Sequence, residues 1–139
     1  MPTKSTKPTK QATVTSYEYV GHPYPIRVHF APTPEAWGAL LAEIGIDEPY
    51  PSTHGRATLF THPSRDARTI LTLSPEAENR NSIEVVGLMA HEITHAIQHI
   101  EDTIGTHLDA ETEAYLHQAL IQWLLESYAD AGRSFTDAP

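Results

Sequence analysis

The longest helical pattern in the sequence begins after Asn81 and continues to about residue 101. Asn81 and Glu84 have the spacing of a capping box, in which each side chain accepts a hydrogen bond from a backbone N–H at the start of a helix. Apolar residues then recur at helical intervals, and Gly105 breaks the pattern. A second helical pattern covers residues 109–130. This region therefore predicts two consecutive helices joined by a short connection.

The residues before this helical pair carry strand signals on both sides of one further helix. Thr33 is suited to be an N-cap and Pro34 to be the first residue of that helix, which is expected to end at Gly45. Four segments are rich in β-branched and aromatic residues and predict strands: residues 17–20, 26–30, 57–61 and 69–73. The order strand–strand–helix–strand–strand–helix–helix predicts an α+β fold with a small antiparallel or mixed sheet.

Length and charge exclude several classes of protein. A chain of 139 residues suits one domain, which we place at residues 13–132. Residues 1–12 are almost free of apolar side chains and predict a flexible basic tail, and residues 133–139 predict a polar C-terminal tail. The net charge of −9 argues against a nucleic-acid partner. We expect a cytoplasmic protein without a membrane partner, because no segment resembles a membrane span or a secretory signal.

The first of the two C-terminal helical patterns contains the sequence His91-Glu92-Ile93-Thr94-His95, or H-E-x-x-H. Residues four apart lie on one face of a helix, so His91 and His95 can reach the same metal ion. Glu92 projects to the side of that face, where its carboxylate can take a proton from water activated by the metal. Because imidazole and carboxylate groups suit zinc, and the chain has no cysteine, one Zn²⁺ per chain is the predicted cofactor.

A catalytic zinc ion needs a third protein ligand. The second helix of the pair would bring its first turns back toward His95, which favours a glutamate there. Glu111 is the first choice, and it shares a polar strip of the helix that suits a site. Glu113 is the alternative, because it shares a face with core leucines, where a buried glutamate needs a partner and a metal ion would be one. The remaining candidates are His99, His107 and Asp109.

The motif and the glutamate that follows it resemble the gluzincins, zinc peptidases whose ligands are two histidines and one glutamate. Glu111-Thr112-Glu113-Ala114 matches the E-x-x-A pattern of several gluzincin families through Glu111, whereas families with Glu directly before Ala would select Glu113. The short distance from His95 is similar to that in the smallest members, the minigluzincins. Small phage and prophage proteins carry similar motifs. The resemblance covers residues 68–128 and implies a zincin-like fold, with the H-E-x-x-H helix followed by the helix of the ligand glutamate.

This resemblance implies hydrolysis of peptide bonds in a peptide or protein substrate, with Glu92 as general base. A substrate backbone would pair with an edge strand formed by Thr69, Ile70, Leu71 and Thr72. Hydrolysis also needs a donor for the oxyanion. The candidates are Tyr115, placed first, and His117, His107 and Tyr128.

Residues 119–125 of the last helix are apolar around most of its circumference, which suggests a second kind of function. In this alternative, zinc stabilises a non-enzymatic module that binds a partner through the last helix, including a second copy of the chain in a homodimer. A regulatory protease partnered with a repressor is a third option. Glu92 favours an enzyme, because a purely structural zinc site has no use for a base beside its ligands.

Overall fold

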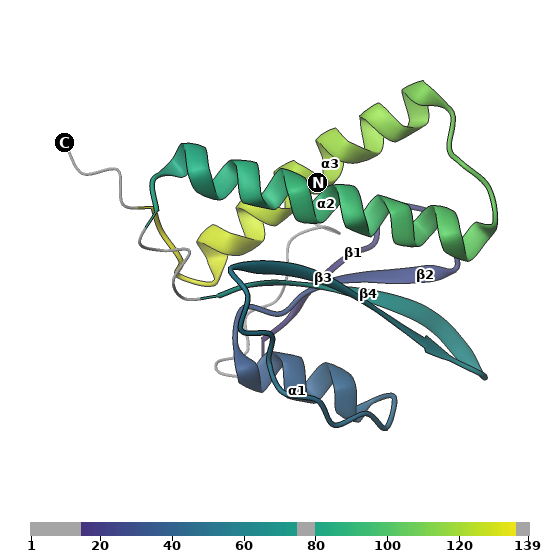
Figure 1. The fold of residues 1–139 in the computed structure, drawn as a ribbon, viewed down its shortest axis with the longest axis horizontal. Helices are drawn as coiled ribbons and strands as arrows, with labels where there is room; N and C mark the ends of the chain where they lie inside the picture. The colour runs from purple at the N-terminus through teal and green to yellow at the C-terminus, as the bar shows by residue number, and fades with distance from the viewer. Residues whose placement is uncertain (1–14, 75–79, 136–139) are drawn as a thin grey trace.

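The computed structural model describes residues 15–74 and 80–135, and its fold is α+β, as the sequence predicts (Figure 1). The predicted N-terminal tail, residues 1–12, lies outside the described residues. The elements follow the predicted order, and their bounds are β1 Tyr17–Tyr19, β2 Ile26–Phe30, α1 Pro34–Ala42, β3 Gly55–His62, β4 Arg65–Leu73, α2 Ser82–Ile104 and α3 Ala110–Asp130.

The four strands form one mixed sheet in the order β1-β2-β4-β3. Strands β1 and β2 are antiparallel, β2 and β4 are parallel, and β3 and β4 form an antiparallel hairpin. Strand β4 is therefore interior, and β3 is the edge strand on its side of the sheet.

The prediction that Thr69, Ile70, Leu71 and Thr72 form an edge strand is wrong. These residues lie in β4, whose backbone pairs with β2 on one side and with β3 on the other. Their side chains are also buried, with exposed fractions of 1% or less. A strand that is hydrogen-bonded on both sides has no free backbone groups for a substrate peptide.

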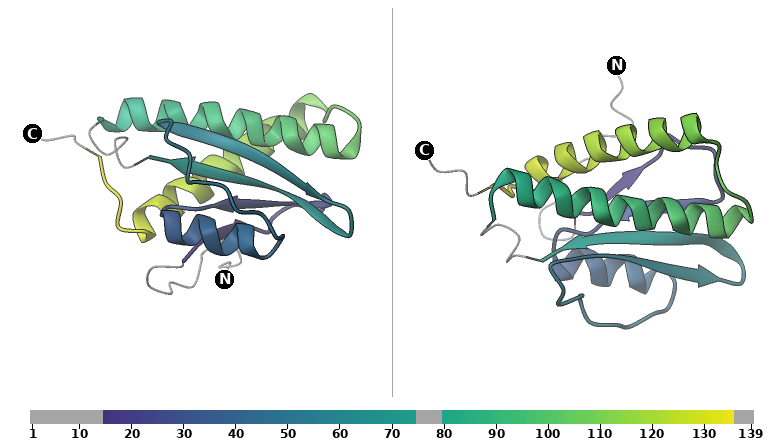
Figure 2. Two further views of the ribbon diagram at one scale, coloured as in Figure 1. Left: turned by 60° about the horizontal axis from the view of Figure 1, so that its bottom comes forward. Right: turned by 45° about the horizontal axis from the view of Figure 1, so that its top comes forward.

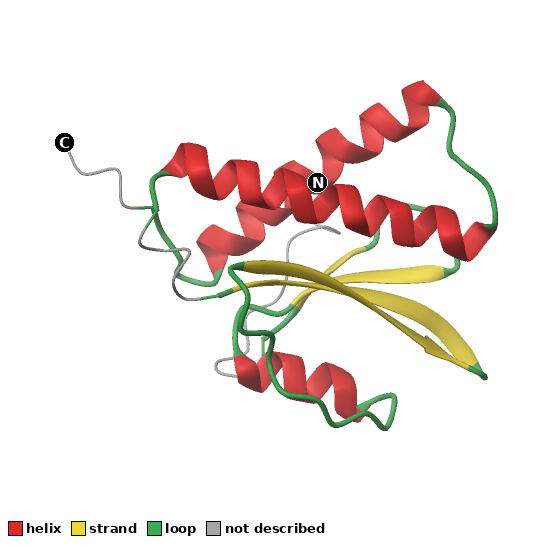
Figure 3. Cartoon of the chain, viewed as in Figure 1, coloured by secondary structure: helices red, strands yellow, loops and turns green. Residues whose placement is uncertain are grey.

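The sheet lies between two layers of helix, with α2 and α3 on one face and α1 on the other (Figures 2 and 3). Alternate residues of each strand face opposite layers. The larger apolar cluster joins α2 and α3 to the sheet through residues such as Val28, Leu71, Ile93 and Trp123. The smaller cluster packs Trp37 and Leu40 of α1 against Phe60 and Ile70.

The helix ends follow the local signals of the sequence. Asn81 and Glu84 form the capping box at the start of α2, and Gly105 ends that helix with a φ of 79°. That left-handed conformation is one that glycine adopts without strain. The Asp109 side chain accepts a hydrogen bond from the Thr112 N–H at the start of α3. Both ends of α2 and the start of α3 are therefore set by contacts between residues that are close in the sequence.

The chain itself covers the apolar face of α3. Leu116, Leu120, Trp123 and Leu124 are buried in the larger cluster, and Tyr115 is the large hydrophobic side chain of the described α3 residues that is exposed. The apolar character of residues 119–125 is thus explained by packing within the chain. No helix among the described residues is long and apolar enough to cross a membrane.

The start of the predicted C-terminal tail packs against the body of the molecule. Arg133 donates hydrogen bonds to the carbonyl oxygens of Pro32, Leu73 and Ser74. The Phe135 ring stacks on Tyr128 with ring centroids 5.6 Å apart. The structure therefore places these residues against the fold, and residues 136–139 lie outside the described part.

Candidate metal centre

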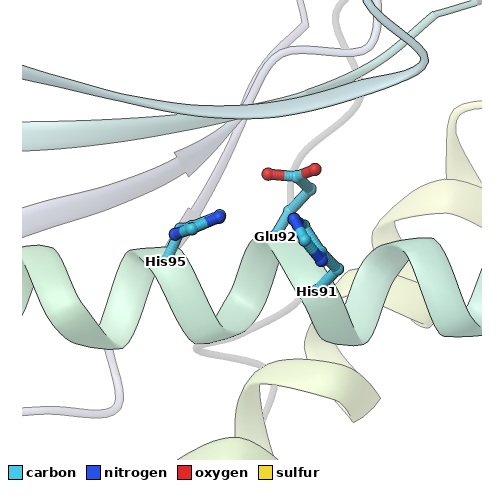
Figure 4. Close-up of side chains that lie close together, drawn as sticks. All are labelled: His91, Glu92 and His95. Atoms are coloured by element: carbon cyan, nitrogen blue, oxygen red, sulfur yellow. The ribbon is translucent and has the colours of Figure 1, made fainter.

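His91, Glu92 and His95 lie together on the surface of α2, as the H-E-x-x-H spacing predicts (Figure 4). One potential ligand atom from each side chain lies within 4.8 Å of the others, so this group could hold a metal ion. The two imidazole rings have centroids 4.9 Å apart and an angle of 78° between their planes. Both histidines are exposed to solvent, whereas Glu92 is buried.

One ring nitrogen of His95 is held by a neighbour on the same helix. The Nδ1 atom lies 2.9 Å from Oε1 of Gln98, and a carbonyl oxygen can only accept a hydrogen bond. In this arrangement the proton of a neutral His95 ring lies on Nδ1, which leaves Nε2 with a free lone pair. Hydrogen bonds of this kind orient metal-ligating histidines in proteins.

Glu92 lies between α2 and the edge strand β3. Its side chain accepts a hydrogen bond from the Ala57 backbone N–H, and the residue is 5% exposed. Burial raises the pKa of the Glu92 carboxyl above its ordinary value, and the neighbouring His91, His95 and Arg56 oppose that shift by favouring the charged form. A carboxylate with a raised pKa is better matched to proton transfer near neutral pH than a solvated one.

Gly55 allows the close approach of β3 to α2 at this point. A Cβ atom at Gly55 would lie 3.0 Å from side-chain atoms of Leu88 and 3.1 Å from Cγ of Glu92. Both distances are shorter than ordinary van der Waals contacts. The missing side chain of Gly55 therefore helps to place the Glu92 carboxyl beside the edge strand.

A cavity of about 370 Å³ runs along the junction of β3 and α2. Half-buried His99, one turn after His95, also lines this cavity, and its Nδ1 lies 2.8 Å from Oγ1 of Thr69. Burial lowers the pKa of His99 and so favours the neutral ring. The other residues around the cavity are Thr53, Gly55, Arg56, Ala57, His91, Glu92 and His95.

The structure does not bring Glu111 or Glu113 into the ligand group. Among the described residues, the group contains only His91, Glu92 and His95, so the other candidates His99, His107 and Asp109 also lie outside it. Glu111 is exposed in the first turn of α3, and Glu113 is half-buried. The start of α3 rises away from α2 in Figure 1.

The first candidate for the oxyanion donor, Tyr115, lies away from the ligand group. It lines a different cavity, with Thr112 and Ala119 of α3 and with Tyr19 and Tyr24 near the sheet. His117, two residues later, contacts Thr94 of α2 at 3.3 Å. Positions two apart differ by about 200° around a helix of 3.6 residues per turn, so they cannot both face α2.

The other two candidates for the oxyanion donor are also outside the cavity of the ligand group. The hydroxyl of the buried Tyr128 donates a hydrogen bond to the carbonyl oxygen of the exposed Ser134. His107 is exposed and lies 3.6 Å from Glu101, beyond the end of α2. Of the four candidates, His117 is the one that contacts a residue of the H-E-x-x-H segment.

Gly55, Arg56 and Ala57 are site residues that the sequence did not identify. They contact or line the same cavity as His91 and Glu92, although they lie far away in the sequence. The pattern of residues 57–61 predicted a strand, but nothing local showed that this strand is the edge strand next to the motif. A glycine at the start of a strand was the available signal, because such a glycine often marks a close approach of another element.

Comparison with known proteins gives no match: no family model, no curated protein and no solved structure is significantly similar to this chain. Inference about the activity therefore depends on the residues of the site.

Proposed function

We propose that this chain is a zinc-dependent peptidase of gluzincin type with a zincin-like fold, in which His91 and His95 bind the metal and Glu92 is the general base. The observation that carries this proposal is the position of Glu92. Its carboxyl is buried within 4.8 Å of ligand atoms of two exposed histidines and lies against an edge strand. A surface ion pair or a simple structural metal site would not require a buried carboxylate there.

The donor set fits zinc. Two imidazoles four residues apart on a helix, one of them oriented by Gln98, are typical zinc ligands. The chain has no cysteine, so thiolate ligands of softer metals are excluded. When bound, a zinc ion supplies Lewis acidity that polarises a carbonyl group and acidifies water.

The protein's own residues would transfer the proton and stabilise the oxyanion. Glu92 takes a proton from the attacking water and returns it to the leaving amine, because its raised pKa suits both steps. The Ala57 N–H holds that carboxyl in place. Of the four candidates, His117 contacts Thr94 within the motif, but its Nδ1 faces the Glu113 carbonyl oxygen, so its Nε2 can donate to an oxyanion only when the ring is protonated.

A substrate peptide would pair with β3 in this proposal and not with β4. Among the described residues β3 pairs with β4 alone, so the other side of its backbone faces no further strand, although the Ala57 N–H is bound to Glu92. Its first residues line the cavity that contains His91 and Glu92. A peptide added to this edge would pass directly beside the general base.

The third ligand remains a prediction that substitution can test. Glu111→Ala should weaken zinc affinity far more than Glu113→Ala, because Glu111 has the ligand position of the E-x-x-A pattern and is exposed, whereas Glu113 is half-buried on α3. The measurement is competition for zinc against a chromophoric chelator. The reverse ranking would assign the ligand to Glu113, and two unchanged affinities would remove both residues.

The proposed activity is tested with a mixed peptide library incubated with zinc-loaded protein and analysed by mass spectrometry. The wild type should cut a subset of peptides, and Glu92→Gln should lower the rate by roughly 10²–10⁴-fold while it retains zinc. Glu126→Gln, an exposed carboxylate on α3, is the matched control and should behave as wild type. Zinc binding without cleavage of any peptide would contradict the peptidase and favour the alternative of a zinc-stabilised, non-enzymatic module.

A further inference from the structure

Arg56 is exposed on the edge strand and lines two cavities at once. One is the cavity that contains His91, Glu92 and His95. The other, of about 210 Å³, lies on the opposite face of β3, where Trp37, Tyr50 and Thr58 also line it. A peptide that follows the free edge of β3 past Glu92 would therefore meet the Arg56 side chain.

The guanidinium of Arg56 forms no hydrogen bond or ion pair with the described residues, in contrast to the other described arginines, although its charge favours the carboxylate form of Glu92. Arg27 and Arg68 form ion pairs with Glu18 and Glu43. The remaining three are hydrogen-bonded to carbonyl oxygens or to a histidine ring: Arg65, Arg80 and Arg133. No hydrogen bond or ion pair within the described residues holds Arg56, although the chain has twice as many acidic as basic residues, 18 against 9.

Two hydroxyl groups next to Arg56 also lack partners. Thr58 follows two residues later on the same face of β3, and Thr72 is the partner of Arg56 in the ladder to β4. Their Oγ1 atoms are buried, and neither has a hydrogen-bond partner within the described part of the chain. A ligand with acceptor oxygens at Arg56 could satisfy Thr58, which lines the same cavity.

We propose that Arg56 and Thr58 form a subsite that binds a carboxylate of the peptide substrate. This inference rests on the proposed peptidase function and names the chemistry of its substrate. An arginine fork suits a planar carboxylate, which it can bind through two parallel hydrogen bonds. The acidic groups around it, Glu48 in the second cavity and Glu92 in the first, disfavour a polyanion and suit a single charge.

The carboxylate could come from an acidic side chain or from the C-terminus of the peptide. Both present the same group to Arg56, and the position of Arg56 favours neither. An acidic side chain would give an endopeptidase that prefers Asp or Glu near the cleaved bond. A terminal carboxylate would give an enzyme that removes residues from the ends of peptides.

The test measures binding, so that it does not depend on turnover. Fluorescein-labelled alanine–glycine octapeptides carry Glu, Gln or Lys at each position in turn, with an amidated C-terminus, and one further Gln series has a free C-terminus. Fluorescence anisotropy is measured with two full-length proteins, Glu92→Gln and the double variant that also carries Arg56→Gln. Each is measured with and without zinc. Runs without zinc separate the contribution of Arg56 from attraction of the carboxylate to the ion.

We expect the best Glu peptide, or the free-carboxylate peptide, to bind about fivefold tighter than its neutral match at low salt, as for a favourable exposed charge pair. Arg56→Gln should remove that preference, and Arg56→Glu should replace it with a preference for Lys. The peptide series whose affinity depends on Arg56 shows whether the bound carboxylate is an acidic side chain or the C-terminus. Equal affinity of the charged and neutral peptides, or a preference that survives Arg56→Gln, would overturn the inference.

The two proposals can fail separately. Cleavage of library peptides without any effect of Arg56 would refute the carboxylate subsite and leave the peptidase. Binding that depends on Arg56 without cleavage would refute the peptidase and leave a carboxylate-binding groove. Thr58→Val is a second variant for the subsite, and it should weaken binding of the same peptides as Arg56→Gln while the melting temperature reports folding.

Discussion

Histidines have opposite environments on the two sides of the molecule. On the side of α2 that borders β3, His91 and His95 are exposed and lie beside a carboxylate. On the sheet face that packs against α1, His29 is 2% exposed, and its Nε2 has no partner within the described residues. The same side chain is thus available for ligand binding in one region and excluded from solvent in the other.

The difference shows where chemistry and stability are separated in this fold. His91 and His95 belong to neither apolar cluster, so they can serve a ligand without loss of core packing. The α1 face buries polar side chains such as those of His29 and Arg68. A charge that is buried there costs free energy of folding. Substitutions in the two regions should therefore change different measured quantities.

The largest effect is expected at the metal ligands. His95→Ala should weaken zinc affinity by more than about 100-fold, since loss of a ligand should cost at least as much as loss of a residue that orients one. The melting temperature of the zinc-free protein should hardly change, because His95 is exposed. Competition with a chromophoric chelator measures the affinity, and His107→Ala, a substitution of another exposed histidine, is the control. Equal zinc affinities of the two variants would remove His95 from the site.

The next largest effect is expected at His29, and it concerns how the free energy of unfolding depends on pH. Burial lowers the pKa of His29 to about 3, whereas the unfolded chain titrates near the ordinary value of 6.5. Below pH 6.5 the unfolded state therefore binds a proton that the native state does not, and stability falls by about 1.4 kcal/mol per pH unit. The charges of Glu18, Arg27 and Arg68 also act on the pKa of His29, and they are the same in the wild type and in a variant at position 29.

His29→Leu should remove this pH dependence. The unfolding free energy of the wild type, relative to that of the variant, should be constant above pH 7 and should fall by about 2 kcal/mol at pH 5. Urea denaturation at a series of pH values measures both. A relative stability that does not change with pH would show that His29 becomes protonated in the native state as readily as in the unfolded chain.

A smaller effect on zinc binding is expected at Gln98. Its side chain fixes the proton of His95 on Nδ1, so Gln98→Ala should weaken zinc affinity by about tenfold. Gln122→Ala, an exposed glutamine on α3, is the matched control. The same chelator competition measures both, and an unchanged affinity would mean that the hydrogen bond does not orient the ligand.

The smallest effect is expected at Gly55, where the edge strand meets α2. Gly55→Ala should destabilise the protein by about 1 kcal/mol, because its Cβ would press on Leu88 and Glu92. Gly87→Ala, on the exposed side of α2 with open space around it, should instead stabilise by up to about 1 kcal/mol. Thermal denaturation distinguishes the two signs. A stabilising Gly55→Ala would show that the close approach is not constrained.

Much of the fold could be predicted because its elements have local signals. The capping box at Asn81, the N-cap at Thr33 and the break at Gly105 are all read from adjacent residues, and the structure confirms them. The ligand group also follows from the spacing within one helix. Each of these features depends on residues only a few positions apart.

The strand order and the residues contributed from other elements could not be predicted in this way. Residues 69–72 were expected to form an edge strand, whereas the parallel pairing with β2 makes β4 an interior strand. Tyr115 was expected near the motif, but the rotation of α3 directs His117 to that side. Both errors concern long-range packing, which the pattern within a segment does not determine.

The metal content of the purified protein tests the central claim most directly. Untagged protein, purified without added zinc or chelator, is analysed for metals by elemental mass spectrometry, together with a variant in which both His91 and His95 are replaced by asparagine. The account predicts about one zinc ion per wild-type chain and none in the variant. A wild type that contains no zinc, and takes up none at micromolar concentrations, would contradict a metal site on α2 and the proposed peptidase with it.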